Sequence, residues 1–194
     1  MVVPLKITLF LIIKDLRQVE SITIDMNAGY VNVIKEIFPQ AKIIIDRFHL
    51  VQLISRSMNK TRVRVMNTLK TSNGEDMKKY RRLKRYWKLL LRNEDELTHT
   101  EYKHYPLFGQ RTDAGIVQEM LEYYPDLHTN YILYQKLLRS MRNKGFNDLT
   151  NILLNTKSSN LSSYMKTSIK TLKKNLYYIE NSFLYPYNNG CIEV

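Results

Sequence analysis

The chain has 194 residues, 44% of them hydrophobic, which is enough for one packed domain or one domain and part of another. Lys and Arg exceed Asp and Glu by 30 to 18, and the net charge of +12 favours polyanionic partners. Nucleic acid is the first such partner to consider, and an acidic membrane surface is the second. The single cysteine, Cys191, excludes an internal disulfide and a cysteine-based zinc site, and it suits a reducing cytoplasm.

The first thirteen residues, MVVPLKITLFLII, are apolar enough to suggest the hydrophobic centre of a signal peptide. No basic segment precedes them and no small-residue cleavage site follows, so a buried strand is the better interpretation. They are also shorter than the roughly 20 apolar residues that a membrane-spanning helix needs. Asp15 ends this run, and a loop or capping role is favoured for it over a catalytic one.

Residues 20–49 have the pattern of a strand, a helix and a second strand. β-branched residues fill the two short runs SITID and AKIIID. The helix between them has an apolar face made of Tyr30, Val33, Ile34 and Ile37. Pro39 ends that helix, because proline has no N–H to continue it.

Asp25 and Asp46 each follow one of these strands directly. Two strands joined by a helix pair in parallel, so both aspartates are expected at the same carboxyl edge of one sheet, where α/β sheets bind ligands. Paired carboxylates can hold a divalent metal. The alternative is that each simply caps the helix that follows its strand.

Residues 77–92 are predicted to form one basic amphipathic helix. Its cations, the candidate DNA-binding residues, are Lys78, Lys79, Arg81, Arg82, Lys84, Arg85 and Lys88. Glu75 and Asp76 suit its amino end, where the helix dipole is positive. Such a helix binds phosphates, lies on a membrane, binds a calmodulin-like partner or simply faces solvent; nucleic acid is favoured here.

Apolar spacing predicts further helices over residues 50–69, 116–124, 127–143, 146–154 and 161–180. In the helix predicted over residues 50–69, the residues assigned to the more solvent-exposed sides are Arg56, Lys60, Arg62 and Arg64. Pro125 is expected to end the second, and Asp126 to cap the third. The solvent side of the last, a second candidate phosphate-binding face, has Lys166, Lys170, Lys173 and Lys174.

The segment from His99 to Ile116 is aromatic and irregular, with Pro106 and Gly109 as breakers. His99 and His104 lie near each other in it and suggest a metal pair. Zinc sites need three or four ligands, so two scattered loop histidines are the favoured interpretation.

The string TIDMNAGYVNVIKEIFPQAKIIIDRFHLVQ, residues 23–52, resembles the DDE-type insertion-sequence transposases of the ISL3 family. In that family a strand ends in Asp-Met, an aromatic-rich helix and a Phe-Pro-x-Ala turn follow, and the next strand ends in Asp-Arg-Phe-His. The string KRYWKLLLRNEDEL and the terminal Asn-Asn-Gly-Cys-Ile-Glu of residues 188–193 resemble two further strings of the family. The resemblance is not evident in residues 1–14.

The resemblance implies an α/β fold: part of a ribonuclease-H-like core with a parallel strand-helix-strand, interrupted by a large all-α insertion that makes the chain mostly helical. The implied domains are a partial core in residues 1–49, the helical insertion in 50–181, where Trp87 packs in the core, and a return to the core in 182–194.

The family's site residues map onto particular positions of this chain. Asp25 matches the second carboxylate of the DDE triad and Glu193 the third, and both are implied ligands of Mg²⁺ or Mn²⁺. Asp46 and His49 match an accessory Asp-x-x-His string. An Ile-Asp-Glu type string for the first carboxylate is not found upstream of Asp25, and Asp15 is too close to Asp25 to replace it.

The expected function is therefore that of a partial transposase. The intact family member cleaves and transfers DNA strands in the bacterial cytoplasm, at the nucleoid when bound to DNA, and a complete transposase is compatible with a homodimer. This chain, which looks like the middle of such an enzyme cut at both ends, is expected to be inactive alone. The alternative is a non-catalytic, basic nucleic-acid-binding remnant or regulator.

Overall fold

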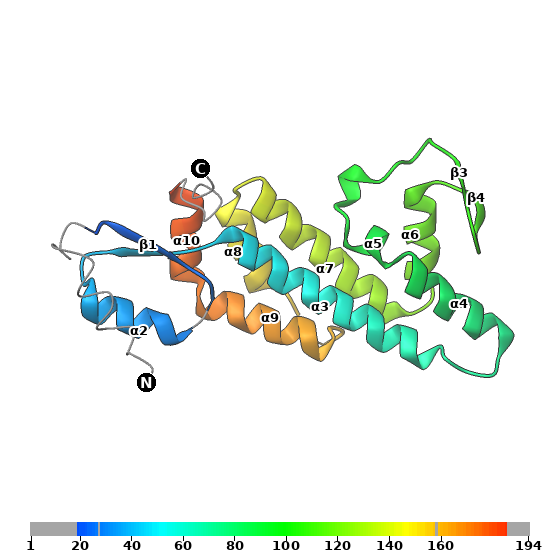
Figure 1. Ribbon diagram of the computed structural model, residues 1–194, viewed down its shortest axis with the longest axis horizontal. Coiled ribbons are helices and arrows are strands. Elements are labelled where there is room, and N and C mark those ends of the chain that lie inside the picture. Colours follow the sequence, from blue (N-terminus) through cyan, green and yellow to red (C-terminus); the bar gives the residue numbers. More distant parts are fainter. Residues whose placement is uncertain (1–18, 27, 158, 186–194) are drawn as a thin grey trace, which may run out of the picture. The chain divides into compact units, whose positions relative to one another are not determined.

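The computed structural model describes residues 19–26, 28–157 and 159–185. The predictions for Asp15 and Glu193 lie outside these residues. The described residues are mostly helical, with two sheets of two strands each (Figure 1). The chain forms two compact units, one from residues 1–50 and 174–194 and the other from residues 51–173.

The first unit contains a parallel strand pair with helices beside it. Its elements are β1 (Ser21–Ile24), α2 (Ala28–Ile37), β2 (Lys42–Ile45), the first turn of α3 (Arg47–Thr68) and α10 (Leu176–Leu184). β1 and β2 pair in parallel, with Ile24 opposite Ile45, which confirms the predicted strand-helix-strand. The buried side of α2 includes Ile34 and Ile37, and Phe38, the residue after the helix, is also buried. Tyr30 is 42% exposed and is not part of this side.

Polar side chains of α10 satisfy the outer edge of β2. Alternate peptide groups of β2 bond to β1: the Lys42 N–H donates to the Glu20 carbonyl and the Asp46 N–H to the Ile24 carbonyl, both at 2.9 Å. The carbonyls of Ile43 and Ile45 therefore point the other way. Asn181 Nδ2 donates to the Ile43 carbonyl at 2.8 Å, and the Ser182 hydroxyl donates to that of Ile45. The outer edge of β2 is thus closed to a further strand.

The second unit is a helical assembly with one small hairpin. After α3 come α4 (Gly74–Arg85), α5 (Trp87–Leu91), η2 (Glu94–Glu96), β3 (Lys103–Tyr105), β4 (Gly109–Arg111), α6 (Asp113–Leu121), α7 (Pro125–Arg142), α8 (Phe146–Asn155) and α9 (Ser163–Lys174). The side chains that its core buries completely include Ile54, Met58, Leu83, Leu90, Ile116, Met120, Leu127 and Leu137. Burial of such side chains supplies most of the stability of a helical domain.

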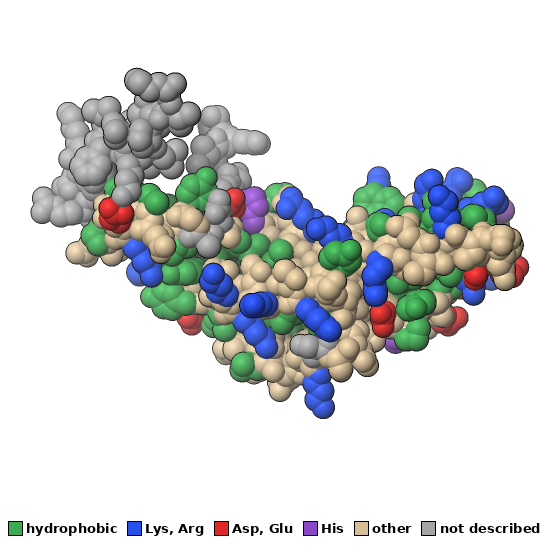
Figure 2. All heavy atoms as spheres, turned by 90° about the horizontal axis from the view of Figure 1, so that it is seen from below, with side chains coloured by type: hydrophobic (Ala, Val, Ile, Leu, Met, Phe, Trp, Pro, Cys, Tyr) green, Lys and Arg blue, Asp and Glu red, His purple; other side chains and the backbone are tan. Residues whose placement is uncertain are grey.

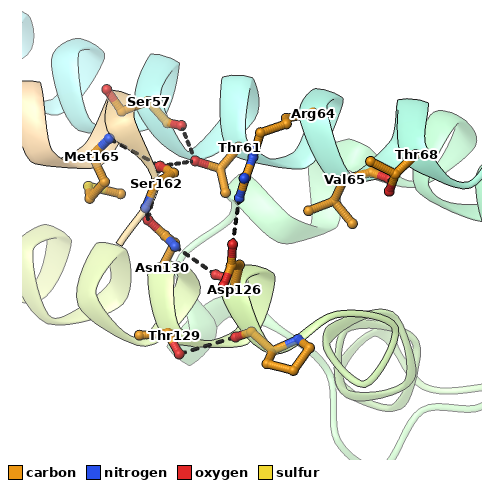
Figure 3. A network of polar contacts seen from close by, with 11 residues as sticks. Ser57, Thr61, Arg64, Val65, Thr68, Asp126, Thr129, Asn130, Ser162 and Met165 are labelled. Carbon is orange, nitrogen blue, oxygen red and sulfur yellow. Dashed lines mark hydrogen bonds and ion pairs between the residues drawn. The ribbon is translucent and has the colours of Figure 1, made fainter. Parts of the chain in front are cut away.

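A buried polar network joins α3, α7 and the start of α9 (Figure 3). The Ser162 hydroxyl accepts from the Met165 N–H at 3.2 Å and so caps α9. It also donates to Asn130 Oδ1 at 3.1 Å and lies 2.6 Å from the Thr61 hydroxyl. Asn130 in turn donates to the Asp126 carbonyl at 2.6 Å. Because the side chains of Thr61, Asn130 and Ser162 are buried, each depends on its partners to replace water.

Two predicted long helices are each broken. The helix expected over 77–92 breaks at Tyr86 (φ −105°, ψ 22°), whose ring packs edge-on against Tyr105 and Phe108 of the hairpin segment. The helix expected over 161–180 breaks at Asn175 (φ −103°, ψ 12°). Asparagine leaves the helical region readily, because its side chain competes with the backbone for hydrogen bonds.

The segment from His99 to Ile116, predicted to be irregular, contains the antiparallel hairpin of β3 and β4. Its turn needs positive φ at Leu107 (80°) and Gly109 (75°), and the Phe108 N–H donates to the Tyr105 carbonyl at 2.9 Å. Strands of three mostly polar residues carry no alternation of apolar and polar positions, so a strand could not be predicted here from the pattern of residues.

The start of α7 also differs from the prediction. Pro125 is the first residue of this helix and does not end the one before it, since α6 ends at Leu121. A proline suits that position because the first N–H of a helix has no partner within it. Tyr124 occupies the capping position. Asp126, predicted to cap, accepts instead from Arg64 at 2.8 Å.

We predict that Ser162→Ala lowers the free energy of unfolding by about 1–3 kcal/mol, because it removes the cap of α9 and leaves Asn130 and Thr61 short of a buried partner. Urea denaturation measures this change. Ser163→Ala is the matched control, because Ser163 is the next residue and is exposed. This variant should change the free energy of unfolding by less than about 0.5 kcal/mol. An equal loss of unfolding free energy in the two variants would contradict the assignment of Ser162 as the buried cap of α9.

Candidate functional site

The first candidate site is the carboxyl edge of the β1–β2 sheet. Asp25 and Asp46 directly follow Ile24 and Ile45, which are register partners in parallel strands. Both aspartates therefore lie at the same edge, as predicted from the sequence. Asp25 is exposed, whereas Asp46 is only 5% exposed. The two carboxylates thus meet very different environments.

Asp46 acts as the cap of α3. Its Oδ1 accepts from the Phe48 N–H at 2.9 Å, and its carbonyl accepts from the His49 N–H at 3.0 Å. The alternative foreseen for this residue, a helix cap after a strand, is therefore what the structure shows. The dipole at the start of a helix also stabilises a negative charge there.

His49 lies in the first turn of α3, half-buried. The ring of Phe48 meets its imidazole edge-on, with 5.6 Å between ring centroids, and Phe48 itself is 61% exposed. The Asp46-x-x-His49 string thus starts a helix beside the sheet edge. The cap that Asp46 provides to α3 is enough by itself to explain an aspartate at this position.

The described residues of this edge do not by themselves fit a divalent metal ion. Across residues 19–26, 28–157 and 159–185, no three side chains of His, Cys, Asp or Glu come together as a metal site requires. Asp46 is engaged in capping, which leaves Asp25 as the exposed carboxylate at the edge. Mg²⁺ and Ca²⁺ take six or more oxygen ligands, and a single exposed carboxylate supplies at most two of them. His99 and His104, both exposed, also form no such group.

The second candidate site is the basic surface of α4. Asn73 caps this helix through its side chain, which accepts from the N–H groups of Glu75 and Asp76. Both acids lie in the first turn, as predicted. The cations exposed on one side of α4 are Lys78, Arg81, Lys84 and Arg85, which we call the α4 stripe. At 100° per residue these positions fall within about a third of the helix circumference.

Arg82, predicted to bind DNA, has a structural role instead. Its side chain is 14% exposed and pairs with Glu119 at 2.6 Å. Its Nε and Nη2 both donate to the Leu107 carbonyl, at 2.9 and 2.7 Å, and the guanidinium lies 4.3 Å from the centroid of the Phe108 ring. Arg82 therefore joins α4 to the hairpin and to α6, and its charge is compensated.

Other predicted cations take intermediate positions. Lys79 is half-buried, with its ammonium 5.7 Å from the centre of the Tyr123 ring. Lys88 is exposed but belongs to α5, beyond the break at Tyr86. Trp87, expected in the core, is half-buried. The α4 stripe thus contains fewer cations than the seven that the sequence predicted.

Buried cations elsewhere in this unit also hold the fold together. Arg62, assigned to a wet side of α3, is only 7% exposed and donates to the Leu83 carbonyl at 3.1 Å. Burial lowers the pKa of its guanidinium from the ordinary value. Sequence spacing could not identify this role, because an arginine between apolar positions is compatible with either side of a helix.

Tyr105 and Arg92 both engage the buried carboxylate of Asp113. Arg92 pairs with Asp113 Oδ2 at 2.9 Å, and the Tyr105 hydroxyl donates to Oδ1. Burial, followed by the bond to Asp113, raises the pKa of Tyr105 to about 12, so the phenol remains a donor at neutral pH. These groups hold the hairpin segment against the end of α5 and the start of α6.

We predict that Arg82→Gln lowers the free energy of unfolding by about 2–3 kcal/mol, because Glu119 and the Leu107 carbonyl lose a charged donor. Arg81→Gln, one residue away and exposed, should change stability by less than about 0.5 kcal/mol. Thermal and urea unfolding of the two variants measure this difference. A destabilisation by Arg81→Gln as large as that by Arg82→Gln would refute the division between a structural and an exposed arginine.

Residues 6–194 match the model of the ISL3 family of DDE transposases, described as Transposase. The match includes residues 6–14, which the sequence resemblance had not been expected to reach. No curated protein and no solved structure matches the chain. Among the described residues, no helix is long and apolar enough to cross a membrane.

Proposed function

The chain belongs to the ISL3 family of DDE transposases, and we propose that its basic helical unit binds DNA. In an intact family member it takes part in DNA strand cleavage and transfer. The observation that carries this proposal is the family match over residues 6–194, a range that includes both Asp25 and the α4 stripe.

The first unit is proposed to be part of a ribonuclease-H-like core. The parallel β1–β2 pair, with Asp25 at its carboxyl edge, is the motif such a core needs. Because α10 closes the outer edge of β2, further strands of the sheet have to join at β1. On this proposal residues 1–49 and 182–194 belong to the core and residues 50–181 to the helical insertion.

Asp25 is proposed as a catalytic carboxylate, with Glu193 as its partner in holding the divalent metal that DDE transposases use. Mg²⁺ or Mn²⁺ is the expected ion, since carboxylate oxygens suit both. The described residues support Asp25 by its exposure at the sheet edge. They argue against Asp46 as a further ligand, because it caps α3.

We propose that the chain binds DNA but does not cut it alone. Among the described residues, no three side chains of His, Cys, Asp or Glu come together as a divalent metal site requires. Separate from catalysis, the α4 stripe gives the chain a surface for phosphates. A non-catalytic DNA-binding remnant or regulator is the second candidate function, and the exposure of this stripe favours it.

The test combines binding and cleavage of a random-sequence duplex by the purified chain. Lys78→Gln/Arg81→Gln/Arg85→Gln should weaken binding, measured by fluorescence anisotropy, at least about tenfold, because each cation lost removes a phosphate contact. Glutamine keeps the helix propensity high, so α4 should remain folded. With Mg²⁺ or Mn²⁺ added, the wild-type chain should leave a supercoiled plasmid intact.

The matched control removes the same charge elsewhere, through Lys136→Gln/Arg142→Gln/Lys144→Gln, and should bind nearly as well as the wild type. These cations lie on or just after α7, where Arg142 pairs with Glu96 at 2.9 Å. Equal weakening by both triple variants would refute the α4 stripe as the binding surface. Metal-dependent nicking that disappears in Asp25→Asn would overturn the proposal that the chain is inactive alone.

A further inference from the structure

A second basic surface lies on α3 and α9, which pack side by side (Figure 1). The hydroxyls of Ser57 and Ser168 lie 2.6 Å apart across the contact, as do those of Thr61 and Ser162. Ser168, Thr61 and Ser162 are nearly or fully buried. α3 is therefore joined to α9 at two points, one within α9 and one at the residue just before it.

Neither α3 nor α9 contains a single Asp or Glu. Arg64, an exposed cation of α3 in this unit, pairs with Asp126 of α7 at 2.8 Å. The other exposed cations of the two helices within this unit, which we call the α3–α9 face, are Arg56, Lys60, Lys166, Lys170 and Lys173. On α9 the lysines recur at intervals of four and three residues, so they lie on one side of the helix. Figure 2 shows Lys and Arg side chains over α9 with no acidic side chain among them.

The charges of the α3–α9 face are not neutralised within the described part of the chain. Arg56 donates to the amide of Gln52 at 2.8 Å, and the Lys60 ammonium lies 5.7 Å from the centre of the Tyr164 ring. Neither partner is a carboxylate. By contrast, α7 shows how this protein compensates surface cations, since Arg139 and Arg142 both pair with the acids of η2.

An unneutralised face of this kind costs stability in the free protein. Like charges three or four residues apart on a helix repel each other and destabilise it. Lys166 with Lys170, and Lys170 with Lys173, are such pairs. A bound polyanion removes this repulsion and releases its own counterions, so association gains from both. The cap at Ser162 and the buried contacts with α3 fix the lysine side of α9 before binding.

We propose that the α3–α9 face binds the sugar-phosphate backbone of nucleic acid without sequence preference, as a second surface beside the α4 stripe. The inference rests on the proposed function for the identity of the polyanion. Lysines at exposed helix positions contact phosphates as point charges and read no base edges. An acidic membrane fits less well, because Met165, Ile169 and Leu172 of α9 are buried and are not available to enter lipid.

The test uses the full chain and a random-sequence duplex at several salt concentrations. Lys166→Gln/Lys170→Gln/Lys173→Gln should weaken binding severalfold and reduce the slope of log affinity against log salt by up to about 2.7, at roughly 0.9 per phosphate contact. The control Lys136→Gln/Arg142→Gln/Lys144→Gln should leave the slope within about one unit of the wild type. Circular dichroism verifies that each variant is folded.

A second readout needs no substitution. Acetylation of the wild-type chain by an amine-reactive ester, read by mass spectrometry, should slow at Lys166, Lys170 and Lys173 when DNA is bound and stay unchanged at Lys136. Unchanged acetylation at the α9 lysines, or an α9 variant with the wild-type salt slope, would overturn the inference.

These outcomes separate the two proposals. Loss of binding in the α4 variant with no effect of the α9 variant leaves the proposed function standing and overturns the α3–α9 face. Absence of any DNA binding by the wild-type chain overturns both. Binding of the wild-type chain to phosphatidylserine vesicles that is lost in the α9 variant, without protection by DNA, would assign the face to a membrane.

Discussion

The helical unit depends on the hydrogen bonds of one buried group, the hydroxyl of Ser162. It caps α9 and meets Thr61 of α3 and Asn130 of α7, so elements more than thirty residues apart in sequence are fixed at one point. A buried polar group of this kind is costly unless every partner is present, which makes the arrangement specific. These contacts fix the positions of α3 and α9, and so they determine where the lysines of α9 and the cations of α3 lie on the surface.

The same unit uses arginine in two different ways. Arg62 and Arg82 are largely withdrawn from solvent and donate to the carbonyls of Leu83 and Leu107. Arg81 and Arg85 are exposed one residue or one turn away from Arg82. Since a buried guanidinium must have its donors satisfied, a structural arginine has little freedom to bind a ligand. Only the exposed members of the basic helix remain to contact phosphates.

The sequence predicted those parts of the fold that local patterns determine. The β-branched runs before Asp25 and Asp46 gave the parallel strand pair, and apolar spacing located most helices. The capping alternative for Asp46 was also available from the sequence. Three features depended on tertiary contacts that no local pattern encodes: the break at Tyr86, where the hairpin receives its ring; the hairpin itself; and the role of Arg82, whose partners lie 25 and 37 residues away.

The candidate sites, too, were predicted in part by local patterns and in part depend on tertiary contacts. Residue type and spacing predicted a basic surface on α4, but its membership changed when Arg82 proved structural and Lys88 fell beyond the helix break. At the sheet edge, the sequence predicted that Asp25 and Asp46 lie together, and the structure distinguishes them by exposure. The role of Asp25 in catalysis rests on the family match and stays a proposal, as does that of Glu193.

The central claim is that this chain holds DNA through exposed cations on its helical unit. The most direct measurement is the salt dependence of the affinity of the wild-type chain for a random-sequence duplex. We expect a linear decrease of log affinity with log salt and a slope between about −3 and −8, at roughly 0.9 per phosphate neutralised. An affinity that does not change with salt, or no binding at low salt, would contradict it.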